Sequence, residues 1–224
     1  ACNTVGLLYM PLHDSWRDAE LSHLLKLADV KVVVSLNEYR SFNHRQMFLE
    51  LAKNLPQLKA IFCLGEPDQQ SSSDFISSLS VSAEGTVRKA HAFSALMQCE
   101  NPLNDSEIQA RKPDPDLPAA IMLSGGTTAI SKISRFSSNN LLAMLEPAAH
   151  AARFTQDDVA LAIAPAGTGA TGYIYPILMP LLNGATTVIL PRWGDPQVVI
   201  DLIAKYQCSY AVGIPAQLTK LVPA

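Results

Sequence analysis

The sequence lacks an excess of charge of either sign and is poor in aromatic residues. Its 224 residues include 17 Lys and Arg against 20 Asp and Glu, and 7% of them are aromatic. The basic residues are dispersed, so no basic stripe is present that would displace counterions from a nucleic-acid backbone. We therefore predict no nucleic-acid partner, and we expect any anionic ligand to be bound by a few neighbouring residues at one site.

Cysteine pairs, metal-ligand spacings and the commonest hydrolase motif are also missing. The four cysteines are far apart, with no Cys-x-x-Cys pair and no histidine spaced to complete a metal site. Gly-x-Ser-x-Gly is absent, and no charged-then-apolar leader opens the chain. These absences predict reduced thiols, no metal held by protein ligands and a cytoplasmic location. The cysteines are Cys2, Cys63, Cys99 and Cys208.

No charged residue occurs between Asp158 and Arg192. Prolines at 165, 176 and 180 cut this apolar stretch into pieces shorter than the ~20 residues of a membrane-spanning helix. Strands of a parallel sheet that is covered on both faces are continuously apolar. The stretch therefore predicts strand, loop, helix and strand in a buried core, and no membrane partner.

What is present is an alternation of strands and helices. Strands are predicted at 30–36, 58–64, 119–123, 159–164, 186–190 and 209–212, and helices at 19–27, 42–55, 137–152, 173–182 and 196–206. Ser137 or Ser138 is expected to cap the third helix, and the proline-rich segment 101–118 is predicted to be a linker. This alternation predicts an α/β fold with mostly parallel sheets.

Small and hydroxyl-bearing residues follow the strand predicted at 119–123. They are Ser124, Gly125, Gly126, Thr127 and Thr128, and Lys132 comes soon after them. Glycines let backbone N–H groups approach phosphate oxygens, hydroxyls add hydrogen-bond donors, and a lysine balances the negative charge of the phosphates. The run predicts a triphosphate cradle, although its lysine stands too far from the second glycine for a P-loop. A solvated loop between a strand and a helix is the alternative.

The same run resembles the phosphate loop of the adenylate-forming superfamily (acyl- and aryl-CoA ligases, aryl-acid AMP ligases, nonribosomal adenylation domains), commonly S-G-[GST]-T-T-G-x-P-K. Ala129 replaces the usual glycine and Ser131 the usual proline, so the loop loses a residue that tolerates positive φ and one that stiffens it. These changes are expected to slow or abolish catalysis. Weaker similarities to the superfamily follow in the same order, at 5–12, 16–21, 154–159, 181–190 and 213–218.

This resemblance implies a ligase that uses ATP and Mg²⁺ to join a carboxylate to AMP and then transfers the acyl group to the thiol of CoA or of a carrier-protein phosphopantetheine. Ser124 to Thr128 would hold the phosphates, with Lys132 as the cation. The residues at 133–135 resemble the aryl-acid group and imply an aromatic or cyclic acid. After Pro165, however, the chain has Ala166-Gly167-Thr168-Gly169, where that group often has a His-Asn pair.

The resemblance covers an incomplete part of the family's large N-terminal region. Residues 1–152 would belong to a first α/β subdomain, and residues 153–224 to a second one packed against it. The family's lysine and glutamate segments are absent, so the catalytic residues are unknown. We expect the parent protein to be the enzyme and this chain alone to be inactive.

Two other functions stay open. Gly167-Thr168-Gly169-Ala170-Thr171-Gly172 is a Gly-x-Gly-x-x-Gly run after a predicted strand, and Asp195 follows the next strand. Those features are typical of a dinucleotide-binding oxidoreductase domain, although Pro176 and Pro180 would fall inside its crossover helix. The other alternative is a non-catalytic, degenerate α/β module that binds neither nucleotide.

Overall fold

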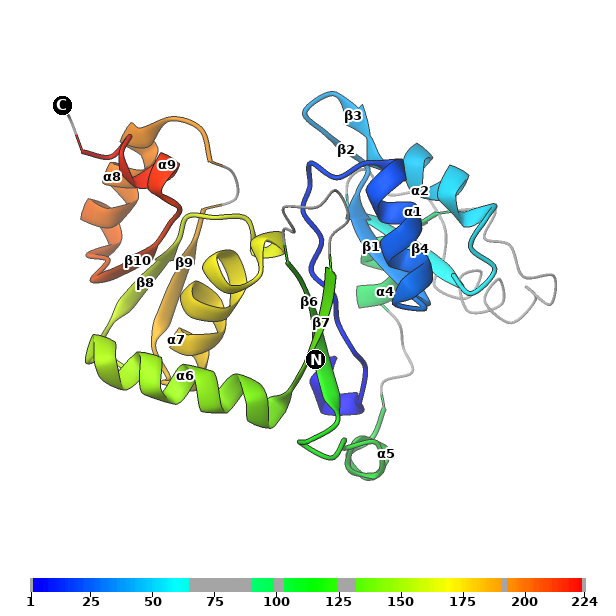
Figure 1. Ribbon diagram of the computed structural model, residues 1–224, viewed down its shortest axis with the longest axis horizontal. Helices are drawn as coiled ribbons and strands as arrows, with labels where there is room; N and C mark the ends of the chain where they lie inside the picture. The colour runs from blue at the N-terminus through cyan, green and yellow to red at the C-terminus, as the bar shows by residue number, and fades with distance from the viewer. Residues whose placement is uncertain (1, 65–89, 99–102, 125–131, 191–192, 223–224) are drawn as a thin grey trace. The chain divides into compact units, whose positions relative to one another are not determined.

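The structure, a computed structural model, describes residues 2–64, 90–98, 103–124, 132–190 and 193–222. The chain forms two compact units, drawn in Figure 1: unit 1 comprises Ala1–Asp14 and Ile108–Ala224, and unit 2 comprises Ser15–Glu107. The α/β class and the mostly parallel sheets are confirmed. The subdomain boundary expected after residue 152 stays a prediction. Among the described residues, no helix has both the length and the apolar character that crossing a bilayer requires.

Unit 2 contains a parallel sheet in the order β1-β4-β5. Its elements are α1 (Asp18–Leu27), β1 (Val32–Leu36), β2 (Glu38–Tyr39), β3 (Phe42–Asn43), α2 (His44–Ala52), β4 (Ala60–Leu64), β5 (His91–Ala92) and α4 (Phe93–Met97). Leu21, Leu24 and Leu25 recur at helical spacing on α1 and are fully buried. The Asn43 side chain caps α2 by accepting a hydrogen bond from the Gln46 N–H at 2.8 Å. The two helices and two strands predicted for this unit are present with shifted ends. The prediction was wrong at the start of the second helix: Phe42 and Asn43 pair with β2 in a short antiparallel hairpin, and α2 begins at His44.

Unit 1 contains a second parallel sheet, in the order β10-β8-β9. Its strands are β8 (Val159–Ala162), β9 (Thr186–Ile189) and β10 (Tyr210–Val212), and its helices include α8 (Pro196–Tyr206) and α9 (Pro215–Leu218). Because alternate strand residues face opposite sides, Leu161 packs in one apolar cluster with Val199 of α8, and Ala160 in another with Ile174 and Met179. Helical segments therefore cover both faces, which explains the uncharged sequence.

The helix predicted at 173–182 begins earlier and is wound differently. Residues Ala170–Leu178 form a π-helix, η3, which follows the 3₁₀ turn η2 (Ala166–Thr168) and continues as the short α-helix α7 (Met179–Leu182). Pro176 and Pro180 have no N–H to donate to an α-helical partner. The wider i→i+5 turns of a π-helix replace the regular helix expected at this place.

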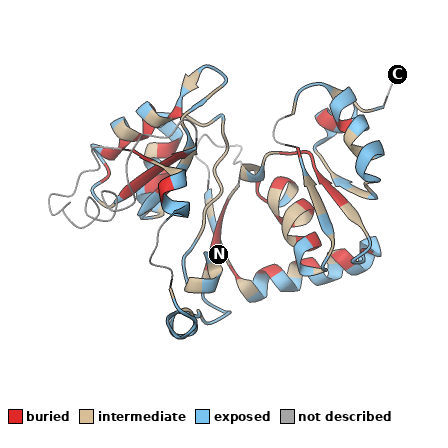
Figure 2. Cartoon of the chain, turned by 180° about the vertical axis from the view of Figure 1, so that it is seen from behind, coloured by how far each residue is buried: buried red, intermediate tan, exposed pale blue. Residues whose placement is uncertain are grey.

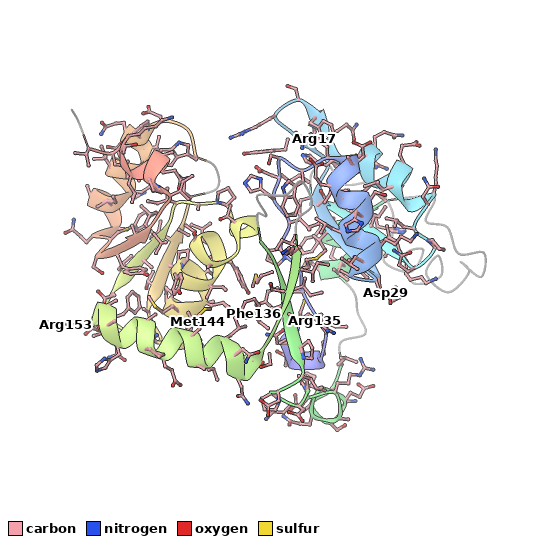
Figure 3. The ribbon with its side chains drawn as sticks, in the orientation of Figure 1. Arg17, Asp29, Arg135, Phe136, Met144 and Arg153 are labelled. Carbon is pink, nitrogen blue, oxygen red and sulfur yellow. The ribbon has the colours of Figure 1, made fainter. Side chains whose placement is uncertain are left out.

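A β-hairpin supplies the other sheet of unit 1. Strand β6 (Pro118–Ser124) pairs antiparallel with β7 (Lys132–Ser137), and the last pair is Ser124 with Lys132. Figure 2 shows β6 buried along much of its length. Strand β7 was not predicted from the sequence, because the glycine- and hydroxyl-rich run after residue 123 is typical of a loop that leads into a helix. On β7, Phe136 packs with Met144 of the following helix against one apolar cluster, and Arg135 lies on the other side of the strand (Figure 3).

The helix α6 (Ser138–Ala152) follows β7 directly. Ser137 caps it: its Oγ accepts from the Asn140 N–H at 3.0 Å, and the Asn140 side chain accepts from the Ser137 N–H at 3.2 Å. The expected cap is confirmed. The segment 101–118, predicted to be a linker, contains a short helix, α5 (Asp105–Ala110). The Asn104 side chain caps its start by accepting a hydrogen bond from the Glu107 N–H at 3.0 Å.

Two glycines of the Gly-x-Gly-x-x-Gly run are fixed by close backbone packing. A Cβ at Gly167 would overlap the carbonyl group of Leu12, and a Cβ at Gly172 would overlap the carbonyl oxygen of Pro165. Neither neighbour is a side chain that can turn away. At Gly194, by contrast, a Cβ would have nothing within 4 Å.

We predict that Gly172→Ala lowers the free energy of unfolding by about 1–3 kcal/mol, because an overpacked site must shift backbone. Chemical denaturation of the chain measures this effect. Gly194→Ala is the matched control and should stay within about 0.5 kcal/mol of wild type. Equal effects of the two substitutions would contradict the close packing of η3 against Pro165.

Candidate active site

The predicted phosphate loop is the connection of the β6–β7 hairpin. Its first and last predicted ligands, Ser124 and Lys132, lie opposite each other in the ladder, so their Cα atoms are about 5 Å apart. Lys132 is exposed. The seven residues between Ser124 and Lys132 lie outside the described residues: Gly125, Gly126, Thr127, Thr128, Ala129, Ile130 and Ser131. The structure therefore describes how the loop ends are held, and phosphate contact stays a prediction.

Segments from distant parts of the sequence meet β6 near this end. The N-terminal segment runs parallel to β6, since Tyr9 bridges to Ala120 and its carbonyl accepts from the Ile121 N–H at 2.9 Å. The η2 turn and the glycine that follows it lie near both of these segments. Gly167 is packed on the backbone of Leu12 and His13, and a Cβ at Gly169 would lie 3.9 Å from the carbonyl oxygen of Leu123. In Figure 1 the dark-blue N-terminal segment accompanies β6 within unit 1.

His13 and Asp14 form a polar pair on this N-terminal segment. The imidazole Nδ1 lies 3.0 Å from Asp14 Oδ1, and the two side chains are 28% and 32% exposed. A carboxylate at Nδ1 fixes the orientation of the ring. The sequence did not reveal this pair, since no spacing along the chain relates residue 13 to the loop after residue 123.

Tyrosine side chains support η3 from inside the unit. The rings of Tyr9 and Tyr173 meet edge to face, with centroids 5.4 Å apart, and Tyr210 meets Phe154 in the same way at 5.2 Å. Burial raises the pKa of the Tyr9 phenol far above its usual value, and burial also raises the pKa of Tyr210. Both phenols are therefore neutral at physiological pH and act as packing groups.

The structure uses the Gly-x-Gly-x-x-Gly run for packing. The run passes through the 3₁₀ turn η2 into the π-helix η3, whereas a dinucleotide fingerprint opens an α-helix whose N-terminus meets the pyrophosphate. Asp195, which that alternative assigns to a ribose, caps α8 instead by accepting from the Gln197 N–H at 2.9 Å. The dinucleotide-binding interpretation is therefore not favoured. Within the described ranges, no three His, Cys, Asp or Glu side chains gather as metal ligands.

Comparison with known proteins shows that the chain is similar to ligases that activate carboxylic acids. The chain is 26% identical over 214 residues to the medium-chain fatty-acid–CoA ligase of Escherichia coli (strain K12), which covers 95% of the chain and 34% of the relative. It is 25% identical over 221 residues to the salicyl-AMP ligase / salicyl-S-ArCP synthetase of Mycobacterium tuberculosis (strain ATCC 25618 / H37Rv), which covers 97% and 33%. The chain thus spans about a third of the length of these relatives.

Solved structures show the same fold. A putative long-chain-fatty-acid CoA ligase from Rhodopseudomonas palustris CGA009 matches 97% of this chain and 47% of its own, with a TM-score of 0.73 and 17% identity. The anthranilate CoA ligase AuaEII in complex with anthranoyl-AMP matches 97% and 37%, with a TM-score of 0.68 and 16% identity.

The decisive match is to a protein-family model described as "AMP-binding enzyme", which spans residues 1–224. The chain therefore belongs to the AMP-binding enzyme family, as its resemblance to the adenylate-forming superfamily predicted.

Proposed function

We propose that this chain is part of an AMP-forming ligase that activates a carboxylic acid with ATP and transfers the acyl group to the thiol of CoA or of a carrier protein. The whole-chain family match carries this proposal. The β6–β7 hairpin supports it, because the ladder fixes the ends of a sequence rich in phosphate-binding residues. The parent protein would be the enzyme, and this chain alone, a third of the length of its relatives, would be inactive.

The difficulty of the first step is charge, because an anionic carboxylate must approach a polyanionic triphosphate. Ser124, Gly125, Gly126, Thr127 and Thr128 would offer N–H and hydroxyl donors to the phosphates, and the exposed Lys132 would add a positive charge. Mg²⁺ bound with the ATP would neutralise further phosphate charge. This set of donors fits ATP. Ala129 and Ser131 would make catalysis slower than in a protein whose loop has the usual glycine and proline.

We infer an aromatic or cyclic acid as substrate. Relatives named for such acids support this class, among them the 2-hydroxy-7-methoxy-5-methyl-1-naphthoate–CoA ligase of Streptomyces carzinostaticus, which is 27% identical to the chain.

We also infer a cytoplasmic location. No disulfide joins Cys2, Cys63 or Cys208, the cysteines that the structure describes, and this supports a reducing compartment.

Carboxylate-dependent ATP–pyrophosphate exchange tests the proposed function. The longest native form of the protein is assayed with a panel of aromatic, alicyclic and fatty acids. We expect exchange that requires an acid and is fastest with an aromatic or alicyclic one. Exchange with fatty acids alone would overturn only the substrate class, whereas no exchange by folded, full-length protein would overturn the proposed function.

Lys132 gives a second prediction. Lys132→Ala should raise the KM for ATP by about 10- to 100-fold, because the loss of one charged hydrogen bond costs about 1.5–3 kcal/mol. The same exchange assay measures this change. Lys220→Ala, which removes another exposed lysine of unit 1, should leave the KM unchanged. An equal response of both variants would remove Lys132 from the phosphate site.

A further inference from the structure

Strand β1 lies at an edge of the unit 2 sheet. Among the residues that the structure describes, β4 is the one strand that pairs with it. The carbonyl of Lys31, just before β1, accepts from the first N–H of β4 at 3.2 Å, and the N–H of Asn37, just after β1, donates to the last carbonyl of β4 at 2.9 Å. Because successive residues of a strand direct their backbone groups to alternate sides, the odd-numbered residues bond to β4. The N–H and C=O groups of Val32, Val34 and Leu36 therefore point toward the open edge.

The side chains of the same three residues are exposed on one face of the sheet. Their exposed fractions are 49%, 51% and 40%, respectively. Val33, which points to the other face, is 4% exposed, and α2 packs against both β1 and β4. On β4 the first face is covered, since Phe93 of α4 packs against Ala60 and Phe62, which pair with β1. The exposed apolar surface is thus a strip along β1, beside a part of the same face that is already packed.

The sequence of β1 is that of an internal strand. Natural edge strands are protected by charged residues, proline or a bulge. Strand β1 reads Val-Val-Val-Ser-Leu, and its register with β4 is regular. Continuously apolar strands are typical of parallel sheets in which both faces are covered. Neither the composition nor the geometry of β1 therefore suits an edge that stays in water.

The relatives of the chain are long enough to supply what β1 lacks. The chain spans 34% of the length of one relative and 33% of another, so about two-thirds of a parent protein of that length lies outside residues 1–224. A strand needs only about five residues. Pairing within one polypeptide also benefits from a high effective concentration, which favours a segment of the parent protein over a second copy of the chain.

We propose that an extended segment of the parent protein, from outside residues 1–224, pairs with the open edge of β1 and covers its exposed apolar strip. This inference rests on the part of the proposed function that makes the chain a piece of a longer enzyme. The added strand accepts and donates the backbone hydrogen bonds that Val32, Val34 and Leu36 direct outward. Strand β1 then lies inside a wider sheet, and its side chains are buried by the added segment.

Site-resolved hydrogen exchange of the longest native form tests this pairing without any substitution. The N–H groups of Val33 and Ser35 bond to β4 and are the internal controls. The N–H groups of Val34 and Leu36 should exchange within about tenfold of the control rates, because both edges of β1 are then hydrogen-bonded. Exchange about 100-fold or more faster than the controls would show an open edge and would overturn the proposal.

Photo-crosslinking identifies the segment that covers β1. The photoreactive amino acid p-benzoylphenylalanine is placed at residue 32 or, in a separate variant, at residue 36, and mass spectrometry of the longest native form identifies the captured peptides. Both variants should capture one segment from outside residues 1–224, at positions about four residues apart, as strand pairing requires. Capture of a peptide from residues 1–224, of a second copy in a mixture with isotope-labelled protein, or of no peptide would overturn the proposal.

The two failures are distinguishable. Absence of carboxylate-dependent ATP–pyrophosphate exchange would overturn the proposed function and leave the exchange of the β1 amides readable. Unprotected β1 amides in a protein that catalyses ATP–pyrophosphate exchange would overturn only the pairing of β1.

Discussion

The pairing of β7 with β6 is the constraint on which the rest of the site depends. It holds Ser124 and Lys132 opposite each other, so the loop between them is closed by backbone hydrogen bonds that no side chain has to supply. The same β6 strand is bridged by the N-terminal segment at Ala120 and approached by η2 at Leu123. One buried strand therefore positions three segments that lie far apart in the sequence.

The sequence predicted the parallel sheets and most helices because their signals are local. Apolar runs such as 159–164 and the spacing of leucines on α1 reveal burial directly, and the Ser137 cap follows from side-chain chemistry at one position. The strand β7 was missed because its six residues, Lys132–Ser137, lie between a loop and a helix cap, with a short alternation that competes with those stronger signals. The π-helix was missed because periodicity does not distinguish its wider turns from those of an α-helix.

The candidate site also contains some residues that local sequence patterns predicted and others that they did not. The residues proposed to bind phosphate were predicted from composition, since few ligands require glycines, hydroxyls and a lysine together. The His13–Asp14 pair was not predicted, because its place beside β6 depends on a parallel bridge between distant segments. The Gly-x-Gly-x-x-Gly run shows the reverse case: its spacing matches a dinucleotide motif, yet Gly167 and Gly172 are required where backbone meets backbone. A glycine pattern identifies close approach, and only the structure shows what approaches.

The most direct test of acid activation by ATP is to identify the product that the protein forms from ATP and an acid when no thiol is present. Mass spectrometry of the reaction of the longest native form, with the acid that best supports exchange, would reveal it. We expect an acyl adenylate and pyrophosphate, and neither should form without the acid. Formation of ADP and phosphate, or cleavage of ATP that does not depend on the acid, would contradict this expectation.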